Sequence, residues 1–156
     1  LFDRTHWYPR LRFDRIEFGP DLERSGVAAC GGMFPGACDH EVPALIARRL
    51  KAATQPQLVY WLTLNSHLPV VEDSALGTQD CAFGPGAWSA ENPQLCRLFL
   101  THHRVADALH AMLMDPALPP TDVLIVGDHM PPFFDRDSRL RFDGSHVPWI
   151  LLRSMS

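Results

Sequence analysis

Asp122-Val-Leu-Ile-Val-Gly-Asp-His129 is the stretch of sequence that decides the predicted fold. Its apolar, mostly β-branched residues are typical of a buried strand, which here ends at a glycine. A parallel strand that ends this way places the next residues at the carboxyl edge of its sheet, where open α/β folds build their sites. Asp128 and His129 are therefore candidate ligands of a divalent metal ion. The alternative is that Asp128 caps the next segment and His129 is an ordinary surface residue.

A second apolar stretch, Leu58–Leu64, predicts another strand that is buried on both faces and is soon followed by His67. Between the two stretches, helical spacing of apolar residues predicts a helix that begins after the N-cap residue Asn92. Strand, helix and strand in this order predict a parallel crossover, so both strands end at the same edge of the sheet. We therefore expect His67, Asp128 and His129 to lie at one edge and to form a site.

The remaining elements complete an α/β prediction, a mostly parallel sheet flanked by helices. A helix is expected over Asp39–Ala53, with the Asp39 carboxylate accepting from the free backbone amides at its start. Asp39 is thus expected to be structural or solvated rather than a site residue. The loop Asn65–Glu91 is long enough to suggest a functional role, and Val147–Leu152 is predicted as the last strand.

Length, composition and charge exclude several classes of protein. The 156 residues suit one domain or a large piece of a larger one. The net charge is −4, and Lys51 is the only lysine, so the chain has no basic patch for nucleic acid. No apolar stretch approaches the length that spans a bilayer.

The four cysteines fall into two local couples, each of which brackets a loop rich in glycine and proline. The couples are Cys30 with Cys38 and Cys81 with Cys96. Short flexible loops of this kind can be closed by disulfides, and the even number of cysteines suits an oxidising compartment. A structural zinc site would need tighter spacing. The alternative is four reduced cysteines in a cytosolic protein.

The two histidine motifs together resemble a known family. Gly127-Asp128-His129 and Thr63-Leu-Asn-Ser-His67-Leu-Pro69 are similar to the paired motifs of the sulfatase-like branch of the alkaline phosphatase superfamily. Within this branch, the resemblance is nearest to lipoteichoic acid synthase-like phosphoglycerol transferases, with phosphoethanolamine transferases further off. Three further stretches resemble the family and occur in the family's order: Leu1-Phe-Asp-Arg4, Tyr8-Pro-Arg-Leu-Arg-Phe-Asp14 and His146-Val-Pro-Trp149. In the second of these stretches, Arg12 stands where the family usually has a glycine.

The resemblance implies a role for each of these residues. Asp128 and His129 would bind one divalent ion (Mn²⁺, Zn²⁺ or Mg²⁺), which lowers the pKa of the nucleophile and neutralises phosphate charge. His67 would be catalytic and substrate-binding, because it holds the phosphoryl group or helps to protonate the leaving group. Arg4 would grip phosphate through its guanidinium. His146 is a further candidate, with the alternative that it only leads into the last strand.

The family's nucleophilic threonine and metal-binding glutamate lie upstream of the position that Arg4 matches. The resemblance therefore implies that residues 1–156 are the carboxyl-terminal portion of one sulfatase-like catalytic domain, inactive without its amino-terminal half. The implied activity is metal-dependent transfer of a phosphoglycerol- or phosphoethanolamine-type group from a phospholipid to an envelope glycan or lipid. The alternatives are a sulfatase or phosphodiesterase, or a non-catalytic module that binds metal or phosphate. The family's catalytic domain lies on the outer side of a bacterial cytoplasmic membrane, tethered by an upstream membrane segment.

Overall fold

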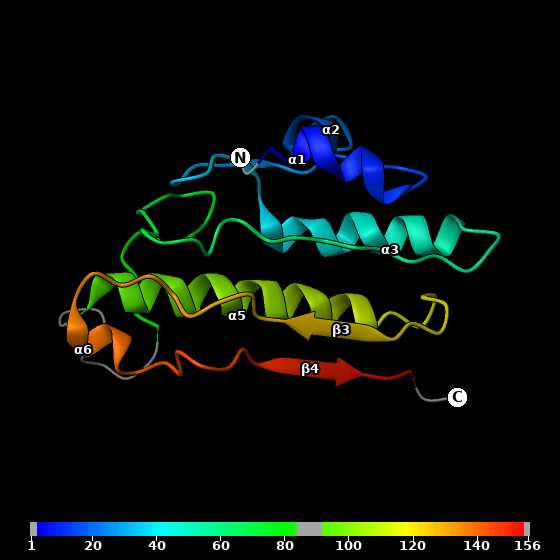
Figure 1. Ribbon diagram of the computed structural model, residues 1–156. Helices are drawn as coiled ribbons and strands as arrows, with labels where there is room; N and C mark the ends of the chain where they lie inside the picture. Colours follow the sequence, from blue (N-terminus) through cyan, green and yellow to red (C-terminus); the bar gives the residue numbers. More distant parts are fainter. Residues whose placement is uncertain (1–2, 84–91, 155–156) are drawn as a thin grey trace.

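Two helices run along the middle of the molecule, α3 (Val42–Ala52) and α5 (Pro93–Leu113), as Figure 1 shows. α3 has Pro43 in its first turn, where the missing amide hydrogen costs nothing. α5 begins at Asn92, whose side-chain oxygen accepts a hydrogen bond from the Leu95 amide at 2.9 Å. Both helices predicted from the sequence are confirmed.

Shorter elements surround these helices in the computed structural model, which describes residues 3–83 and 92–154. Figure 1 shows α1 and α2 above α3 and the β3–β4 sheet below it. The amino-terminal residues of the first resembling stretch and the end of the predicted loop Asn65–Glu91 lie outside the described residues. The shorter elements are α1 (Arg4–Trp7), η1 (Tyr8–Leu11), α2 (Gly19–Arg24), β1 (Ala29–Cys30), β2 (Gly36–Ala37), η2 (Asp39–Glu41), β3 (Val123–Val126), α6 (Arg136–Arg139) and β4 (Trp149–Leu152).

The start of the first long helix differs from the prediction. Asp39 opens the 3-10 turn η2, but its carboxylate does not cap the helix. Instead, Asp39 Oδ2 accepts hydrogen bonds from the Leu64 amide at 2.7 Å and the Asn65 amide at 2.6 Å. Buried amides need acceptors, and this buried carboxylate supplies one for both. The expected cap was wrong, and of the two alternatives for Asp39, structural or solvated, the structure shows the structural one.

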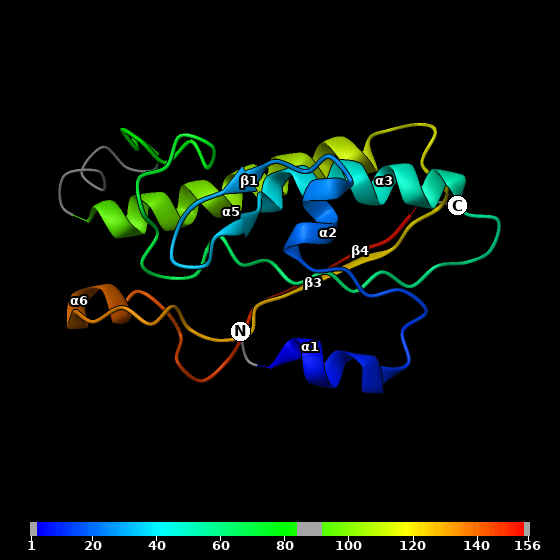
Figure 2. The ribbon, with the colours of Figure 1, turned by 90° about the horizontal axis from the view of Figure 1, so that it is seen from above.

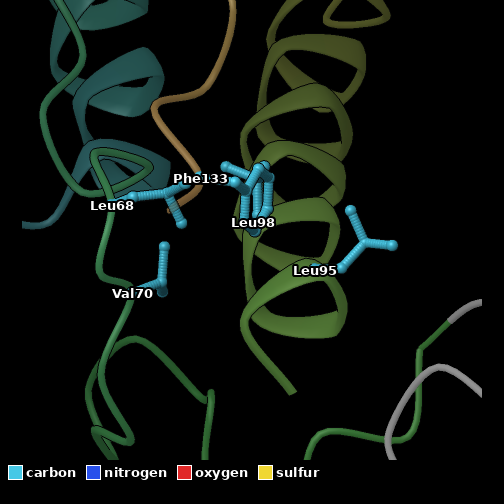
Figure 3. Packing of buried hydrophobic residues seen from close by; sticks show 5 residues of the cluster. All are labelled: Leu68, Val70, Leu95, Leu98 and Phe133. Carbon is cyan, nitrogen blue, oxygen red and sulfur yellow. The ribbon is translucent and has the colours of Figure 1, made fainter. Parts of the chain in front are cut away.

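The largest cluster of buried apolar side chains lies between α5 and two loops. Figure 3 shows Leu68 and Phe133 converging with Leu98 of α5. Leu68 directly follows His67, and Phe133 comes shortly after His129, so this core anchors both histidine-bearing segments. The buried members of the cluster are Leu68, Val70, Leu95, Leu98 and Phe133.

β3 and β4 form a two-stranded antiparallel sheet, in which Val126 pairs with Trp149. The two strands were predicted, but the expectation that the first is buried was wrong. Leu124 is 61% exposed and Trp149 is 68% exposed. None of the core clusters of the described chain contains a residue of either strand. The sheet therefore contributes apolar surface rather than core.

The predicted strand Leu58–Leu64 is not a strand in the described structure. Its chain is extended but belongs to no sheet, and Leu58 is 89% exposed. A strand needs a partner for its backbone amides and carbonyls, and none of the described strands pairs with this segment. Figures 1 and 2 nevertheless show the segment running in the same direction as β3.

The described residues contain two small sheets, β1–β2 and β3–β4, and both are antiparallel. The expected mostly parallel sheet is therefore not formed within residues 3–83 and 92–154. The structure does contain an extended segment, a helix and a strand in this order. The carboxyl ends of the extended segment and of β3 lead to the same side of the molecule. The parallel α/β sheet stays a prediction for a larger domain.

Both predicted disulfides are formed, Cys30–Cys38 and Cys81–Cys96. The first closes the β1–β2 hairpin, and the second ties the loop before α5 to that helix. Among the helices that the structure describes, none has both the length and the hydropathy needed to cross a membrane.

Candidate functional site

His67 and His129 lie close together, as the sequence predicts. Their ring centroids are 6.4 Å apart, and the ring planes meet at 79°. His67 follows the extended segment that ends at Leu64, and His129 follows β3. The two segments run in the same direction, so their carboxyl ends deliver both imidazoles to one edge (Figure 1).

Each of these imidazoles is oriented by the backbone of the next residue. His67 Nδ1 donates to the Leu68 carbonyl at 2.7 Å, and His129 Nδ1 donates to the Met130 carbonyl at 2.8 Å. A carbonyl oxygen only accepts, so Nδ1 carries the hydrogen in both rings. In the neutral form of each ring, Nε2 is then the nitrogen with the lone pair, the arrangement found in histidines that bind metal ions.

Asp128 and His129 have the geometry of a chelating pair. Asp128 Oδ1 accepts from the His129 amide at 2.9 Å, which fixes the carboxylate beside the ring. The other oxygen, Oδ2, lies 3.6 Å from His129 Nε2. Two ligand atoms that bind one tetrahedral zinc ion, each at ~2.1 Å, are about 3.4 Å apart. One ion therefore fits between this oxygen and this nitrogen with little adjustment.

The pair is only part of a metal site. Asp128 and His129 have side chains that are 77% and 54% exposed, so both are open to further ligands. Within residues 3–83 and 92–154, no group of three or more His, Cys, Asp or Glu side chains is placed to hold a metal ion. A complete site needs additional ligands from water or from protein outside the described residues.

Gly127 allows a close contact with Pro148 at the point where the chain leaves β3 and continues to Asp128 and His129. Its amide donates to the Pro148 carbonyl at 2.9 Å. A Cβ atom at position 127 would lie only 3.0 Å from Cδ of Pro148, so any larger residue would push the two segments apart. The glycine of the Gly-Asp-His motif thus has a packing reason.

Phe34 is a site residue that the sequence analysis missed. Its ring lies edge-on against His67, with centroids 4.5 Å apart. Phe34 belongs to the hairpin loop that Cys30–Cys38 closes, so a disulfide holds the aromatic wall of the site. The signal in the sequence was an aromatic residue inside a short cysteine-bracketed loop.

His146 lies near the same edge but is paired elsewhere. Its Nδ1 is 3.0 Å from Asp143 Oδ2, and its side chain is 82% exposed. Hydrogen bonds from the Ser145 amide and from His146 lower the pKa of Asp143. If the β3–β4 register continued past Trp149, His146 would lie opposite His129. Its role in the site stays a prediction.

Arg4 is the predicted phosphate clamp. It is the first residue of α1, which lies above α3 in Figure 1, whereas β3 lies below. Burial raises the pKa of Tyr8, and the positive charge of Arg4 partly offsets this effect. The role of Arg4 as a phosphate clamp stays a prediction.

Taken together, His67, Asp128 and His129 offer two imidazole nitrogens and one carboxylate oxygen at an open edge. Asp128 and His129 could contribute two ligands to a divalent ion, and the neighbouring His67 could exchange a proton with a group beside it. Comparisons of this chain with models of protein families, with curated proteins and with solved structures found no match.

Proposed function

We propose that this chain is the carboxyl-terminal part of a sulfatase-like catalytic domain, which transfers a phosphoglycerol- or phosphoethanolamine-type group to an envelope glycan or lipid. The observation that carries the proposal is the approach of His67 to His129, with ring centroids 6.4 Å apart. Two motifs that resemble one family are far apart in sequence and adjacent in space. That adjacency is what a shared site requires.

Asp128 and His129 would contribute two of the ligands of the metal ion, since Oδ2 and Nε2 lie 3.6 Å apart. When bound, a divalent ion such as Mn²⁺, Zn²⁺ or Mg²⁺ supplies charge neutralisation for the phosphate and lowers the pKa of a nucleophile. His67 keeps Nε2 free because Nδ1 is held by the Leu68 carbonyl. In its protonated form, His67 donates from Nε2 to the oxygen of the leaving group. Arg4 grips the phosphate through its guanidinium in this proposal.

The exposed apolar strands support the inference that this chain is one part of a larger domain. β3 and β4 are apolar at every position, as is typical of strands covered on both faces. With the exposed part of Leu58–Leu64, they present ten exposed apolar side chains. We infer that the amino-terminal half of the same domain covers this surface. A partner here must do two things: add strands to the open edges of the sheet and pack against its two faces. The exposed side chains are Leu58, Val59, Tyr60, Leu124, Ile125, Val126, Trp149, Ile150, Leu151 and Leu152.

The two disulfides support a location on the periplasmic or extracellular face of a membrane, because disulfides persist in oxidising compartments. There the substrate is a phospholipid or a phosphorylated glycan. Hydrolysis by a sulfatase or phosphodiesterase uses the same residues and differs only in giving the group to water.

Calorimetric titration with Zn²⁺ and with Mn²⁺ tests the metal pair. We expect Asp128→Ala to weaken binding by about ten-fold or more, since it removes a direct ligand. The matched control is Asp137→Ala, which removes an exposed carboxylate from α6. Equal heats for the wild type and Asp128→Ala would overturn the ligand assignment.

Group transfer itself is tested in the full-length protein that contains this chain. Vesicles of phosphatidylglycerol or phosphatidylethanolamine serve as donors, with Mn²⁺ present. His67→Ala should lower the rate by about 10²–10⁴-fold, the usual contribution of a general acid. An unchanged rate would remove His67 from the mechanism. Metal binding without any turnover would favour the non-catalytic module.

A further inference from the structure

We propose that Asp39 is the positioning residue that holds His67 in the site, by clamping the turn that carries this histidine. The role of His67 in catalysis rests on the proposed function. The positioning itself does not, because it concerns the geometry of the chain without metal or substrate.

The clamp consists of reciprocal hydrogen bonds between two buried residues. Asp39 Oδ2 accepts from the Leu64 amide at 2.7 Å and from the Asn65 amide at 2.6 Å. Asn65 Oδ1 accepts in return from the Asp39 amide at 2.7 Å. Asp39 is 6% exposed and Asn65 is 8% exposed, so water does not compete for these bonds.

The clamped residues lead directly to the histidine. Leu64 donates to Asp39 through its amide and accepts the His67 amide at 3.1 Å through its carbonyl. The turn from Leu64 to His67 is therefore fixed at both ends. Leu68, the next residue, is anchored in the core against α5.

Asp39 also connects this turn to the opposite wall of the site. It follows Cys38, whose disulfide with Cys30 closes the hairpin loop that carries Phe34. The Phe34 ring contacts His67 edge-on. One residue thus holds the His67 turn against the loop that supplies its aromatic neighbour.

The electrostatic environment fits a carboxylate kept for its hydrogen bonds. Burial raises the pKa of Asp39 to about 6, while the amides of Asn65 and Leu64 lower it. Burying this charge is unfavourable. The two backbone donors are what offsets it, so removing the acceptor leaves both amides buried without a partner.

Nuclear magnetic resonance of the 156-residue chain tests the clamp through the Phe34–His67 ring contact. In Asp39→Ala we expect the ring-to-ring nuclear Overhauser effect to fall about five-fold. Asp39→Asn keeps a carbonyl oxygen for both amides and should retain most of the signal. The matched control, Asp21→Ala, removes a carboxylate that accepts from the Phe18 amide at 2.9 Å in α2, and should leave His67 unchanged.

Each outcome decides the proposal. The proposal is overturned if Asp39→Ala folds and keeps the wild-type contact between the Phe34 and His67 rings. It is also overturned if Asp39→Asn loses this contact as completely as Asp39→Ala does. If Asp39→Ala does not fold, Asn65→Ala decides, because it breaks only the return bond and also removes a buried amide nitrogen that has no partner. Asn65→Ala should lose about half of the ring-to-ring signal. An unchanged signal in this variant would contradict the clamp. Failure of metal binding in Asp128→Ala titrations leaves this result unaffected.

Discussion

The helical half of the molecule and the β3–β4 sheet differ in where their apolar side chains lie. Leu95 and Leu98 of α5 are each 1% exposed, whereas Leu124 of β3 is 61% exposed. The same residue type is core in one region and surface in the other. Monomeric soluble proteins rarely expose large contiguous patches of apolar side chains.

This difference shows that the two regions depend on different partners. The long helices, the disulfides and the loop that carries His67 contribute most of the buried side chains of the core clusters. The sheet has a defined register but no cover among the described residues. Asp128 and His129 follow the end of this uncovered sheet, so in the proposed larger domain the layer that covers the sheet would also lie next to them.

Truncation of a leucine in each region gives the largest contrast. Leu98→Ala should lower the free energy of unfolding by about 2–5 kcal/mol, because it leaves a cavity in the core. Leu124→Ala should lower it by less than about 0.5 kcal/mol, as for other exposed positions. Urea unfolding of both variants measures the difference. Equal losses would show that the sheet is as well packed as the helices.

Acidification should strengthen the helical half through Asp39. The folded pKa of about 6 lies above the ordinary value of 3.8, so the folded state takes up a proton that the unfolded state does not. The contribution is present at low pH and is lost as the pH rises through 6. It amounts to at most about 3 kcal/mol between pH 4 and pH 7.

Asp39→Asn removes this titration, so the variant should gain less stability on acidification than the wild type. The measurement is urea unfolding of both proteins at pH 7 and pH 4.5. Comparing the two proteins cancels other carboxylates such as Glu17, whose pKa is lowered mainly by its hydrogen bond with Arg49. The same pH dependence in both would contradict the assignment.

A charge on the sheet gives the smallest change in stability. Leu124→Glu should alter the free energy of unfolding by less than about 0.5 kcal/mol, while it lowers the binding of a hydrophobic dye and self-association. The control is Leu45→Glu in α3, where the side chain is 5% exposed and a buried charge should unfold the protein. A large loss for Leu124→Glu would mean that the sheet face is already covered.

Local signals explain which elements the sequence could predict. Asn92 and Pro93 determine the start of α5 through a side-chain cap and a fixed dihedral, and both act within one turn. The apolar residues of β3 and β4 likewise predicted strands. Burial of these strands could not be predicted, because it depends on a covering layer that no local pattern describes.

The candidate site was predictable only in part. His67 and His129 were brought together in the prediction by the rule that parallel segments end at one edge, and the structure places them there. The contact with Phe34 and the clamp by Asp39 depend on residues that fold back across the chain. Asp39 before a helix has the pattern of a cap, and only the buried amide of Leu64 explains why its carboxylate points elsewhere.

Pro148 has a consequence for how the Asp-His pair leaves the sheet. It accepts the Gly127 amide but, as a proline, has no amide hydrogen to return. The ladder that begins at Val123 ends at Val126, and the next step has only the single bond from the Gly127 amide. The proline ring on one segment thus removes a hydrogen bond from the step that directly precedes Asp128 and His129, which leaves the backbone there less tied to its neighbour.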